Sequence, residues 1–390
     1  MKIPLGRPYI KKDVVLKYIE ETLDTKWLSG GGSISKLENA IRDYNNDPDG
    51  KYIAVSNGTV AIELPLLMLN NGKRYTAEDE IITTSWSWVA TGFVVSQVGA
   101  TPVWADVNTY GVTDPYDVER KITPRTRAII LVHQMGIPAD IDVFNLISEE
   151  HGIPIIEDSA CALGSEYKGQ KIGKSQNIVT YSFQARKVLT TGGEGGMIVV
   201  RNTEQEKWLR SFRAFGTNTS PLERTQTTKL SKEFFDKIGG NYKLSDVASA
   251  FGLAHLTYVD EEIELRRQAG EYYVEKVYRE LIDCGYPVKQ IHFIPSYCTK
   301  YNWQNYHILI EDIYRDAVVA RLKEKGVMAK WDVQAIHREP VFNGKFNTDY
   351  LPITNRLADH GLWLPFFAEI TRKDQDYVIE TLKEVLDGLK

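Results

Sequence analysis

Residues 181–196 read YSFQARKVLTTGGEGG, and the apolar run MIVV follows at residues 197–200. The pattern predicts a strand, a glycine-rich turn and a second strand, with Lys187 in the turn between them. A lysine held among aromatic and small residues is a candidate Schiff-base former, because desolvation lowers the pKa of such an amine and makes its neutral, nucleophilic form accessible. A surface lysine beside a tight β-turn gives the same pattern. The stretch alone does not separate these two interpretations.

Composition restricts the class of protein. The chain has 390 residues, of which 43% are hydrophobic and 25% are charged, as in ordinary globular proteins. Its length favours two or three domains over one simple core. The formal net charge of −5 argues against a general nucleic-acid-binding protein, which usually carries a basic balance. Apolar runs reach about five residues, whereas a membrane-spanning helix needs roughly 20.

The cysteines indicate a reducing compartment and no metal site. Cys161, Cys284 and Cys298 form no CxxC pair and have no zinc-like spacing with the seven histidines. Residues 1–8, MKIPLGRP, lack the apolar core of a signal peptide. We therefore expect a soluble, cytoplasmic protein that binds neither nucleic acid nor membrane.

Strands and helices alternate through the first half of the chain. The predicted strands lie at residues 52–55, 80–83, 101–106, 127–132 and 153–158. The predicted helices lie at residues 12–23, at 33–44 with Ser33 as cap, and at 60–69, 89–98 and 141–150. This rhythm, with nearly continuous apolar strands, predicts a largely parallel sheet covered by helices on both faces.

The second half predicts a smaller α/β unit. A helix at residues 203–214 precedes a polar, turn-rich excursion at 216–240, and Ser245 caps a long helical region that reaches about Leu281. A strand at 306–310 then alternates with helices at 314–325 and 373–389. We predict a large domain at residues 1–255, including the N-terminal segment. The connecting helix and a small C-terminal domain occupy residues 256–390.

Two short motifs follow predicted strands. Ser56-Asn57-Gly58-Thr59 opens a helix, where free N–H groups, a glycine and a hydroxyl suit a phosphate group. A plain helix cap explains the same residues. Glu157-Asp158 ends an apolar strand at the edge where open α/β sheets bind ligands. A buried carboxylate there needs a partner, and a protonated pyridine nitrogen, as in pyridoxal phosphate, is one; a capping or salt-bridged carboxylate is the alternative.

Two further features complete the set. Trp86 and Trp88 follow a strand, and their rings can stack on a heteroaromatic ring or pack in the core. Ser182 lies five residues before Lys187, so its hydroxyl can join the phosphate seat while the lysine reaches the aldehyde carbon. Each feature is weak alone, and their order along the chain is more specific.

In that order and spacing, the chain resembles the DegT/DnrJ/EryC1/StrS family of sugar aminotransferases, which are pyridoxal-phosphate enzymes of the aspartate aminotransferase fold type (fold type I). The resemblance extends from IPLGRP at residues 3–8 and WLSGG at 27–31 to LPFF at 364–367. Between them lie SNGTVA at 56–61, VHQMG at 132–136, EDSACALG at 157–164, the lysine stretch, and GNYKLSD at 240–246.

The resemblance implies roles for individual residues. It implies that Lys187 binds the cofactor covalently and shuttles protons, that Asp158 pairs with the pyridine nitrogen, and that Trp88 lies over the ring. Gly58, Thr59 and Ser182 match phosphate-binding positions. Asn241 matches an asparagine that reaches the phosphate from the neighbouring subunit, so the active unit is expected to be a homodimer with shared sites. His337 and Trp27 match positions near the sugar substrate.

The implied reaction moves an amino group from L-glutamate or L-glutamine to the keto group of a sugar, preferably a nucleotide-linked keto-deoxysugar, by a ping-pong mechanism. A lysine rather than a histidine at position 187 favours transamination over dehydration. Cys161, Lys243 and one extra glycine before Glu194 depart from the usual family pattern. Gln184 stands where many members carry histidine, which leaves open an inosose-like cyclitol ketone or a free or phosphorylated ketosugar.

Two other classes of function compete with this interpretation. A nicotinamide-dependent oxidoreductase also uses βαβ units, but no GxGxxG motif with a following acidic residue occurs after the first strand. A cofactor-binding regulator without turnover is the second, and the presence of both Asp158 and Lys187 argues against it.

Overall fold

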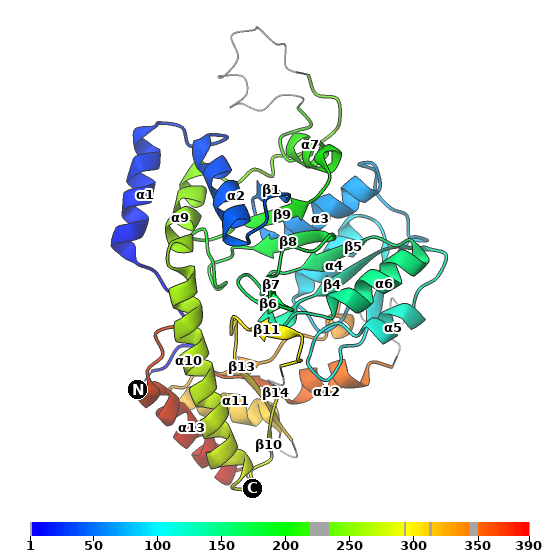
Figure 1. Cartoon of the computed structure of the whole chain (residues 1–390). Helices are drawn as coiled ribbons and strands as arrows, with labels where there is room; N and C mark the ends of the chain where they lie inside the picture. Colours follow the sequence, from blue (N-terminus) through cyan, green and yellow to red (C-terminus); the bar gives the residue numbers. More distant parts are fainter. Residues whose placement is uncertain (1, 218–233, 292–293, 312–313, 343–349, 390) are drawn as a thin grey trace.

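A computed structural model describes residues 2–217, 234–291, 294–311, 314–342 and 350–389 (Figure 1). Most of the predicted excursion at residues 216–240 lies outside these described residues.

Within the described residues, the largest sheet has seven strands. Across the sheet they are β1 (Lys51–Val55), β9 (Gly196–Val200), β8 (Ile178–Ser182), β5 (Ile155–Asp158), β4 (Thr126–Val132), β2 (Glu80–Thr84) and β3 (Thr101–Ala105). The strands from β8 to β3 pair in parallel, and β9 runs antiparallel to both of its neighbours. The prediction of a largely parallel sheet is confirmed.

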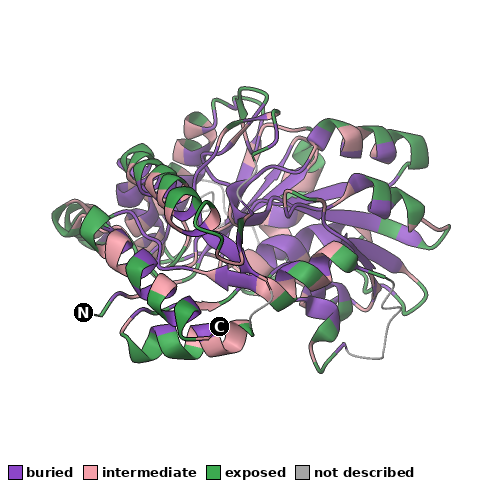
Figure 2. Cartoon of the chain, turned by 90° about the horizontal axis from the view of Figure 1, so that it is seen from below, coloured by how far each residue is buried: buried purple, intermediate pink, exposed green. Residues whose placement is uncertain are grey.

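Helices cover both faces of this sheet. One face carries α3 (Gly58–Leu69), α4 (Val89–Gln97) and α7 (Thr203–Phe212), and the other carries α2 (Gly32–Tyr44), α5 (Pro115–Arg120) and α6 (Ile141–His151). Side chains alternate between the faces, since Ile156 packs with α3 and α4 whereas Ile155 packs with Phe144 of α6. Figure 2 shows the buried strands between helices whose outer surfaces are exposed.

A smaller antiparallel sheet lies in the C-terminal part. Its strands are β10 (Val288–Gln290), β12 (His307–Ile310), β14 (Gly361–Trp363) and β13 (Lys330–Trp331), accompanied by α11 (Arg315–Glu324), α12 (Pro352–His360) and α13 (Arg372–Asp387). This matches the expected second α/β unit. The division of the chain between residues 255 and 256 stays a prediction.

The two parts share packing and one small sheet. The hairpin of β6 (Glu166–Tyr167) and β7 (Gln170–Lys171) pairs with β11 (Cys298–Lys300). A single apolar cluster also contains Ile82 of the large sheet and Ile308 of the small one. Single helical turns, η1 (Gln134–Gly136) and η3 (Ile336–Arg338), complete the described elements near the large sheet.

The predicted long helix after Ser245 is interrupted. It consists of α9 (Asp246–Leu256), α10 (Val259–Val277) and a π-helical turn, η2 (Tyr278–Ile282), which follow one another down one side of the molecule (Figure 1). The Ser245 side chain accepts a hydrogen bond from Ala248 N, so the predicted cap is confirmed. The break falls at Tyr258, whose φ of −131° departs from the helical value, and the preceding Thr257 hydroxyl donates to the carbonyl of Ala254 at 2.7 Å.

The two N-terminal helices lie where they were predicted, but the predicted cap of the second helix is wrong. α1 (Lys12–Asp24) packs against α9, as its apolar spacing allows. α2 begins at Gly32, and its cap is not Ser33. The buried carboxylate of Asp246 accepts hydrogen bonds from the backbone N–H groups of Gly31 (2.8 Å) and Ser33 (2.9 Å). A carboxylate from a distant part of the chain satisfies these groups better than the local hydroxyl, because its charge also complements the helix N-terminus.

Candidate active site

The carboxyl ends of the parallel strands meet at one edge of the large sheet and border a cleft of about 620 Å³. The wall from the small sheet includes Lys330 of β13 and Trp363 of β14. The cleft brings together most of the residues that the sequence singled out: Gly58, Thr59, Trp88, Asp158, Ser182 and Lys187. They come from α3, the residue before α4, β5, β8 and the turn after β8, so the topology gathers residues far apart in the sequence.

Asp158 ends β5 and is only 5% exposed. Its Oδ2 accepts a hydrogen bond from Thr91 Oγ1 of α4 at 3.0 Å, and its Oδ1 accepts one from Ala160 N at 3.1 Å. Burial raises the pKa of this carboxyl group, and the two hydrogen bonds and the charge of Lys187 offset the effect only in part. Within the described part of the chain, Asp158 forms no ion pair, although the charge of Lys187 acts on its carboxylate.

Lys187 lies in the turn between β8 and β9. The turn is held by backbone hydrogen bonds from Phe183 N to Gly195 O and from Ala185 N to Gly193 O, both of 2.8 Å. Gly192 adopts φ +83°, a left-handed conformation that glycine tolerates, so the extra glycine is accommodated without strain. The Lys187 amine donates a hydrogen bond to Cys161 Sγ at 3.1 Å. Cys161, the departure from the family pattern, therefore contacts the candidate reactive amine.

The phosphate-seat residues lie at the start of α3. Asn57 caps this helix, since its side chain accepts a hydrogen bond from Val60 N at 3.0 Å. Gly58 faces Ser182 of β8 so closely that a Cβ at position 58 would lie 2.7 Å from the Ser182 Cβ. A larger residue there would force the strand and the helix apart. The arrangement leaves helix N-terminal N–H groups and two hydroxyls at the cleft, which suits an anionic oxygen group.

The two tryptophans have different environments. Trp88 precedes α4, lines the cleft and is 57% exposed, so one aromatic surface is available to a flat ligand. Trp86 is fully buried and packs with Met135 and Val107 in an apolar cluster. Stacking on a ligand therefore remains possible for Trp88, whereas core packing is the role of Trp86.

Three predicted site residues do not line this cleft. His337 is buried, and its Nδ1 lies 2.6 Å from Ser85 Oγ; burial and the charge of Arg338 lower the pKa of its imidazole. Asn241 is exposed and accepts a hydrogen bond from Lys243 Nζ at 2.7 Å. Trp27 donates from Nε1 to the carbonyl of Ser29 at 2.9 Å. The roles of these three residues stay predictions.

Asn241 and Trp27 lie near a second cavity. This cavity has a volume of about 800 Å³, and Gly30, Gly31, Ala214 and Lys243 are among its lining residues. Asn241 forms a backbone bridge with Ala214, and Ser29 forms one with Ser245. The GNYKLSD and WLSGG motifs therefore meet at one surface, which is built from residues other than those of the cleft.

Several cleft residues had not been singled out from the sequence. Thr91 donates a hydrogen bond to Asp158. Its position three residues after Trp88 predicts that it lies at the cleft only once Trp88 is known to line the cleft. Arg186 directly precedes Lys187, and Lys330 opens the two-residue strand β13. Such a short strand has no periodic pattern that identifies a cleft residue.

The cleft residues fit pyridoxal phosphate. Asp158 is a buried carboxylate without an ion pair, which suits a protonated ring nitrogen. The start of α3 suits the phosphate group, and the exposed Trp88 ring suits the flat heterocycle. The Lys187 amine forms no ion pair within the described residues.

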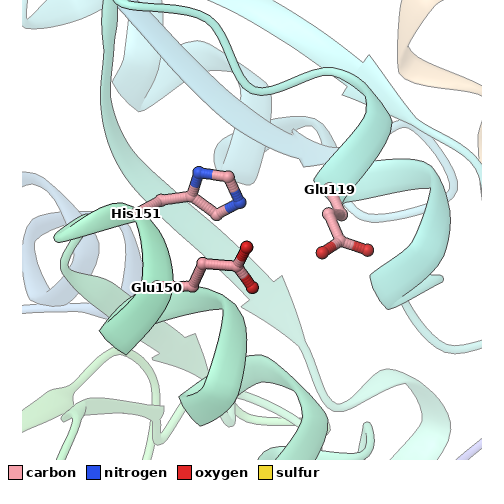
Figure 3. Close-up of side chains that lie close together, drawn as sticks. All are labelled: Glu119, Glu150 and His151. Carbon is pink, nitrogen blue, oxygen red and sulfur yellow. The ribbon is translucent and has the colours of Figure 1, made fainter.

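One cluster of possible metal ligands lies elsewhere. Figure 3 shows Glu119 of α5 beside Glu150 and His151 of α6, all of them exposed. Among the described residues this is the only such group, and exposed acidic groups of this kind are common without an ion. In the described helices, none has both the length and the apolar run needed to cross a membrane.

The layers and sheet order are those of the fold type I aminotransferases, so the chain has the architecture of this class of enzyme. The family model for the DegT/DnrJ/EryC1/StrS aminotransferase family matches residues 9–383. The chain belongs to this family, and its members are enzymes.

Solved structures resemble the whole chain. Helicobacter pylori PseC, an aminotransferase involved in the biosynthesis of pseudoaminic acid, superposes with a TM-score of 0.88 at 23% identity and full coverage of both chains (100% each). S. venezuelae DesV, solved with a ketimine intermediate, gives 0.85 at 25% identity and 99% coverage of each. 3-Amino-5-hydroxybenzoic acid (AHBA) synthase gives 0.86 at 22% identity, covering 99% of this chain and 100% of its own.

Proposed function

We propose that the protein is a pyridoxal-phosphate-dependent aminotransferase that moves an amino group from L-glutamate or L-glutamine to the keto group of a sugar. The observation that carries the proposal is the pairing of Asp158 and Lys187 in one cleft. A buried carboxylate and an amine, neither of which forms an ion pair among the described residues, line the same cleft. Membership of the aminotransferase family supports the same reaction.

Pyridoxal phosphate, when bound, supplies an electron sink that allows a Cα–H bond of an amino acid to be broken. Lys187 would hold the cofactor through its Nζ, and this amine would move the proton at Cα of the donor once the donor has taken its place on the cofactor. Asp158 keeps the ring nitrogen protonated, while Thr91 and Ala160 N hold this carboxylate in place. The N–H groups of α3 and the hydroxyls of Thr59 and Ser182 bind the phosphate group.

The active unit is proposed to be a homodimer. Asn241 and Trp27 lie away from the cleft of their own chain, near the second cavity. A second copy that places this surface over the cleft would bring Asn241 to the cofactor phosphate of its neighbour. A cytoplasmic location is proposed as well, because Cys161, Cys284 and Cys298 are all unpaired.

The acceptor is proposed to be a nucleotide-linked keto-deoxysugar. The descriptions of PseC and of sugar aminotransferases among the similar structures support a sugar acceptor. A second candidate is a cyclic ketone without a nucleotide, such as an inosose-like cyclitol, or a free or phosphorylated ketosugar. It is favoured by Gln184, which lines the cleft where many family members carry histidine. AHBA synthase, whose name gives a product that is not a sugar, has the same fold, so the fold alone does not select a sugar acceptor.

The test begins with the absorption spectrum of the purified protein loaded with pyridoxal phosphate. We expect a visible band that borohydride removes with covalent labelling of Lys187, and bleaching of the band by L-glutamate or L-glutamine, whichever is the donor. The bleached protein is then offered nucleotide-linked 3- and 4-ketosugars, free and phosphorylated ketosugars, and an inosose. Return of the band identifies the acceptor. A protein that never forms the band contradicts the proposal.

Shared sites are tested by mixing two inactive variants. Lys187→Ala and Asn241→Ala chains, unfolded together and refolded, form hybrid dimers with one intact site and one doubly altered site. Random pairing gives half hybrids, so about a quarter of the wild-type activity is expected. A mixture of Lys187→Ala with a second Lys187-altered chain, such as Lys187→Gln, is the control and stays inactive. No recovery in the first mixture contradicts a site shared between subunits.

A further inference from the structure

Two cations that form no ion pair among the described residues line the cleft beside the candidate reactive lysine. Lys330 stands in register with Trp363 of the neighbouring strand β14, and its Nζ lies 4.3 Å from the centroid of the Trp363 ring. Arg186 precedes Lys187 in the turn after β8, and its side chain is exposed. Among the described residues, neither Arg186 nor Lys330 forms an ion pair.

The two charges act on each other. Burial lowers the pKa of the Lys330 amine, and the positive charge of Arg186 lowers it further. Both side chains line the same cleft, Arg186 from the turn after β8 and Lys330 from the first residue of β13. Two like charges held together without a counterion cost free energy, and an anion between them removes that cost.

Among the described residues, Asp332 and Glu194 line the cleft and form no ion pair with Arg186 or Lys330. Asp332, which opposes the effect of Arg186 on Lys330, is buried, and its Oδ1 contacts Nδ1 of His307. Its Oδ1 also accepts a hydrogen bond from Val333 N at 2.6 Å. Glu194 lines the cleft as well, and in the described structure neither cation pairs with it. Positive charge therefore remains available at this wall.

We propose that Arg186 and Lys330 form a subsite for an anionic oxygen group of the substrate, a carboxylate or a phosphoryl group, separate from the phosphate seat at the start of α3. The guanidinium can bind two oxygens of such a group at once. The ammonium lies over the Trp363 ring, which holds its charge at the same wall of the cleft. This inference rests on the proposed function, since it places a substrate beside Lys187.

Two sources supply this chemistry. The anionic group belongs either to the amino donor, as a carboxylate of glutamate, or to the acceptor, as a phosphoryl group of a nucleotide-linked or phosphorylated ketose. Two simple probes separate them. Glutarate has the two carboxylates of glutamate and no amine, so it binds without reacting. Inorganic pyrophosphate presents phosphoryl oxygens without sugar or base.

The experiment is isothermal titration calorimetry of the cofactor-loaded protein with each probe. The variants are Arg186→Gln and Lys330→Gln, with Lys330→Arg to retain the charge. Lys289→Gln is the matched control, because Lys289 lies in β10, at the other edge of the same small sheet, and pairs with Glu311. We expect each Gln variant to weaken one probe about tenfold or more, and the Arg variant and the control to stay within about threefold of wild type.

Each outcome has a defined meaning. Weaker binding of glutarate alone assigns the subsite to the donor carboxylate, and weaker binding of pyrophosphate alone assigns it to the acceptor. Unchanged affinity for both probes in both Gln variants overturns the inference, as does a wild-type protein that binds neither. The spectrum of the loaded protein is read first. If the loaded wild-type protein shows no borohydride-sensitive band, the proposed function is contradicted. Calorimetry tests the subsite separately, because it measures the binding of the probes and not the reaction.

Discussion

Glu157 and Asp158 are neighbours at the end of β5, and both carboxyl groups are buried. Because side chains alternate along a strand, they face opposite sides of the sheet. Glu157 points toward α6 and accepts hydrogen bonds from Asn177 Nδ2 at 2.8 Å and from the His133 ring, whose Nε2 lies 3.0 Å from Oε2. Asp158 points toward α4 and the cleft, where Thr91 and Ala160 N are its hydrogen-bond donors.

The pKa values of the two groups move in opposite directions. Burial would raise the pKa of Glu157, but the hydrogen bonds from His133 and Asn177, together with the charge of His133, outweigh it and lower the pKa. For Asp158 burial dominates and the pKa rises. The same strand thus carries one carboxylate that the protein satisfies fully and one that it leaves in need of a cation. The difference separates a structural group from a group prepared for a ligand.

The largest effect is expected on the cleft side, from Lys187→Ala. Loss of the amine removes both the covalent attachment and the proton transfer at Cα, so turnover falls about 10⁴-fold or more. The variant still binds the cofactor, without covalent labelling on borohydride treatment. Steady-state assay and mass spectrometry measure the two effects. Lys168→Ala, which alters an exposed lysine paired with Asp142, is the control. Wild-type turnover by Lys187→Ala contradicts the assignment of the reactive amine.

The second prediction concerns Asp158→Asn, which removes the charge of the carboxyl group on the cleft side of β5. Without the carboxylate the ring nitrogen is no longer held protonated, and we expect turnover to fall about 10³-fold. The cofactor-free variant should be no less stable than the wild type at pH 8, because it lacks the cost of an ionised buried carboxylate. Equal turnover of variant and wild type contradicts the role of Asp158.

The raised pKa of Asp158 also predicts how the stability of the cofactor-free protein changes with pH. Since the folded pKa of Asp158 is raised above the unfolded value of about 3.9, the folded cofactor-free protein binds more protons than the unfolded one between these two values. The free energy of unfolding therefore falls as pH rises through this window, and Asp158→Asn lacks this contribution. Urea denaturation of both proteins from pH 4 to pH 8 measures the difference.

Cys161 allows a finer test of the cleft side. Its sulfur accepts the hydrogen bond of the Lys187 amine, and one such bond contributes about 0.5–1.5 kcal/mol, so Cys161→Ala should change turnover by about 2- to 12-fold. Iodoacetamide should label Cys161 in the cofactor-free protein and not in the loaded protein, whereas the exposed Cys284 reacts in both. Equal labelling of Cys161 in the two forms contradicts its place beside the cofactor.

The sequence predicted those features of the fold and site that depend on local pattern. Apolar runs of strand length gave the parallel sheet, and the position of Asp158 at the end of such a run placed it at the correct edge. Lys187 was found because a glycine turn and a second apolar run follow it. These signals work because strand periodicity and turn chemistry are properties of neighbouring residues.

Features that depend on contacts between distant segments could not be predicted. Nothing in the spacing of Trp86 and Trp88 tells which ring is buried and which lines the cleft. Asp246 replaces Ser33 as the cap of α2 only because the two segments meet in the folded chain. Lys330 reaches the cleft from a two-residue strand whose position depends on its partner β14.

Glu157→Gln is expected to have the smallest effect on the chemistry and so sharpens the contrast with Asp158. The amide keeps the shape of the side chain but turns one acceptor into a donor, which opposes either His133 or Asn177 and costs about 1–3 kcal/mol of stability. Turnover per folded, cofactor-loaded molecule should stay within about twofold of wild type.

The pH dependence of stability adds a second measurement. Because the folded pKa of Glu157 is lowered, its contribution to the free energy of unfolding is complete above the unfolded value of about 4.3 and is lost as pH falls through the folded value. The stability difference from wild type should therefore be constant above about pH 6 and shrink in acid, which urea denaturation at several pH values measures. A fully stable Glu157→Gln protein with turnover as low as that of Asp158→Asn would mean that the charge of Glu157 acts on the cofactor through His133, and the two faces of β5 would then share one function.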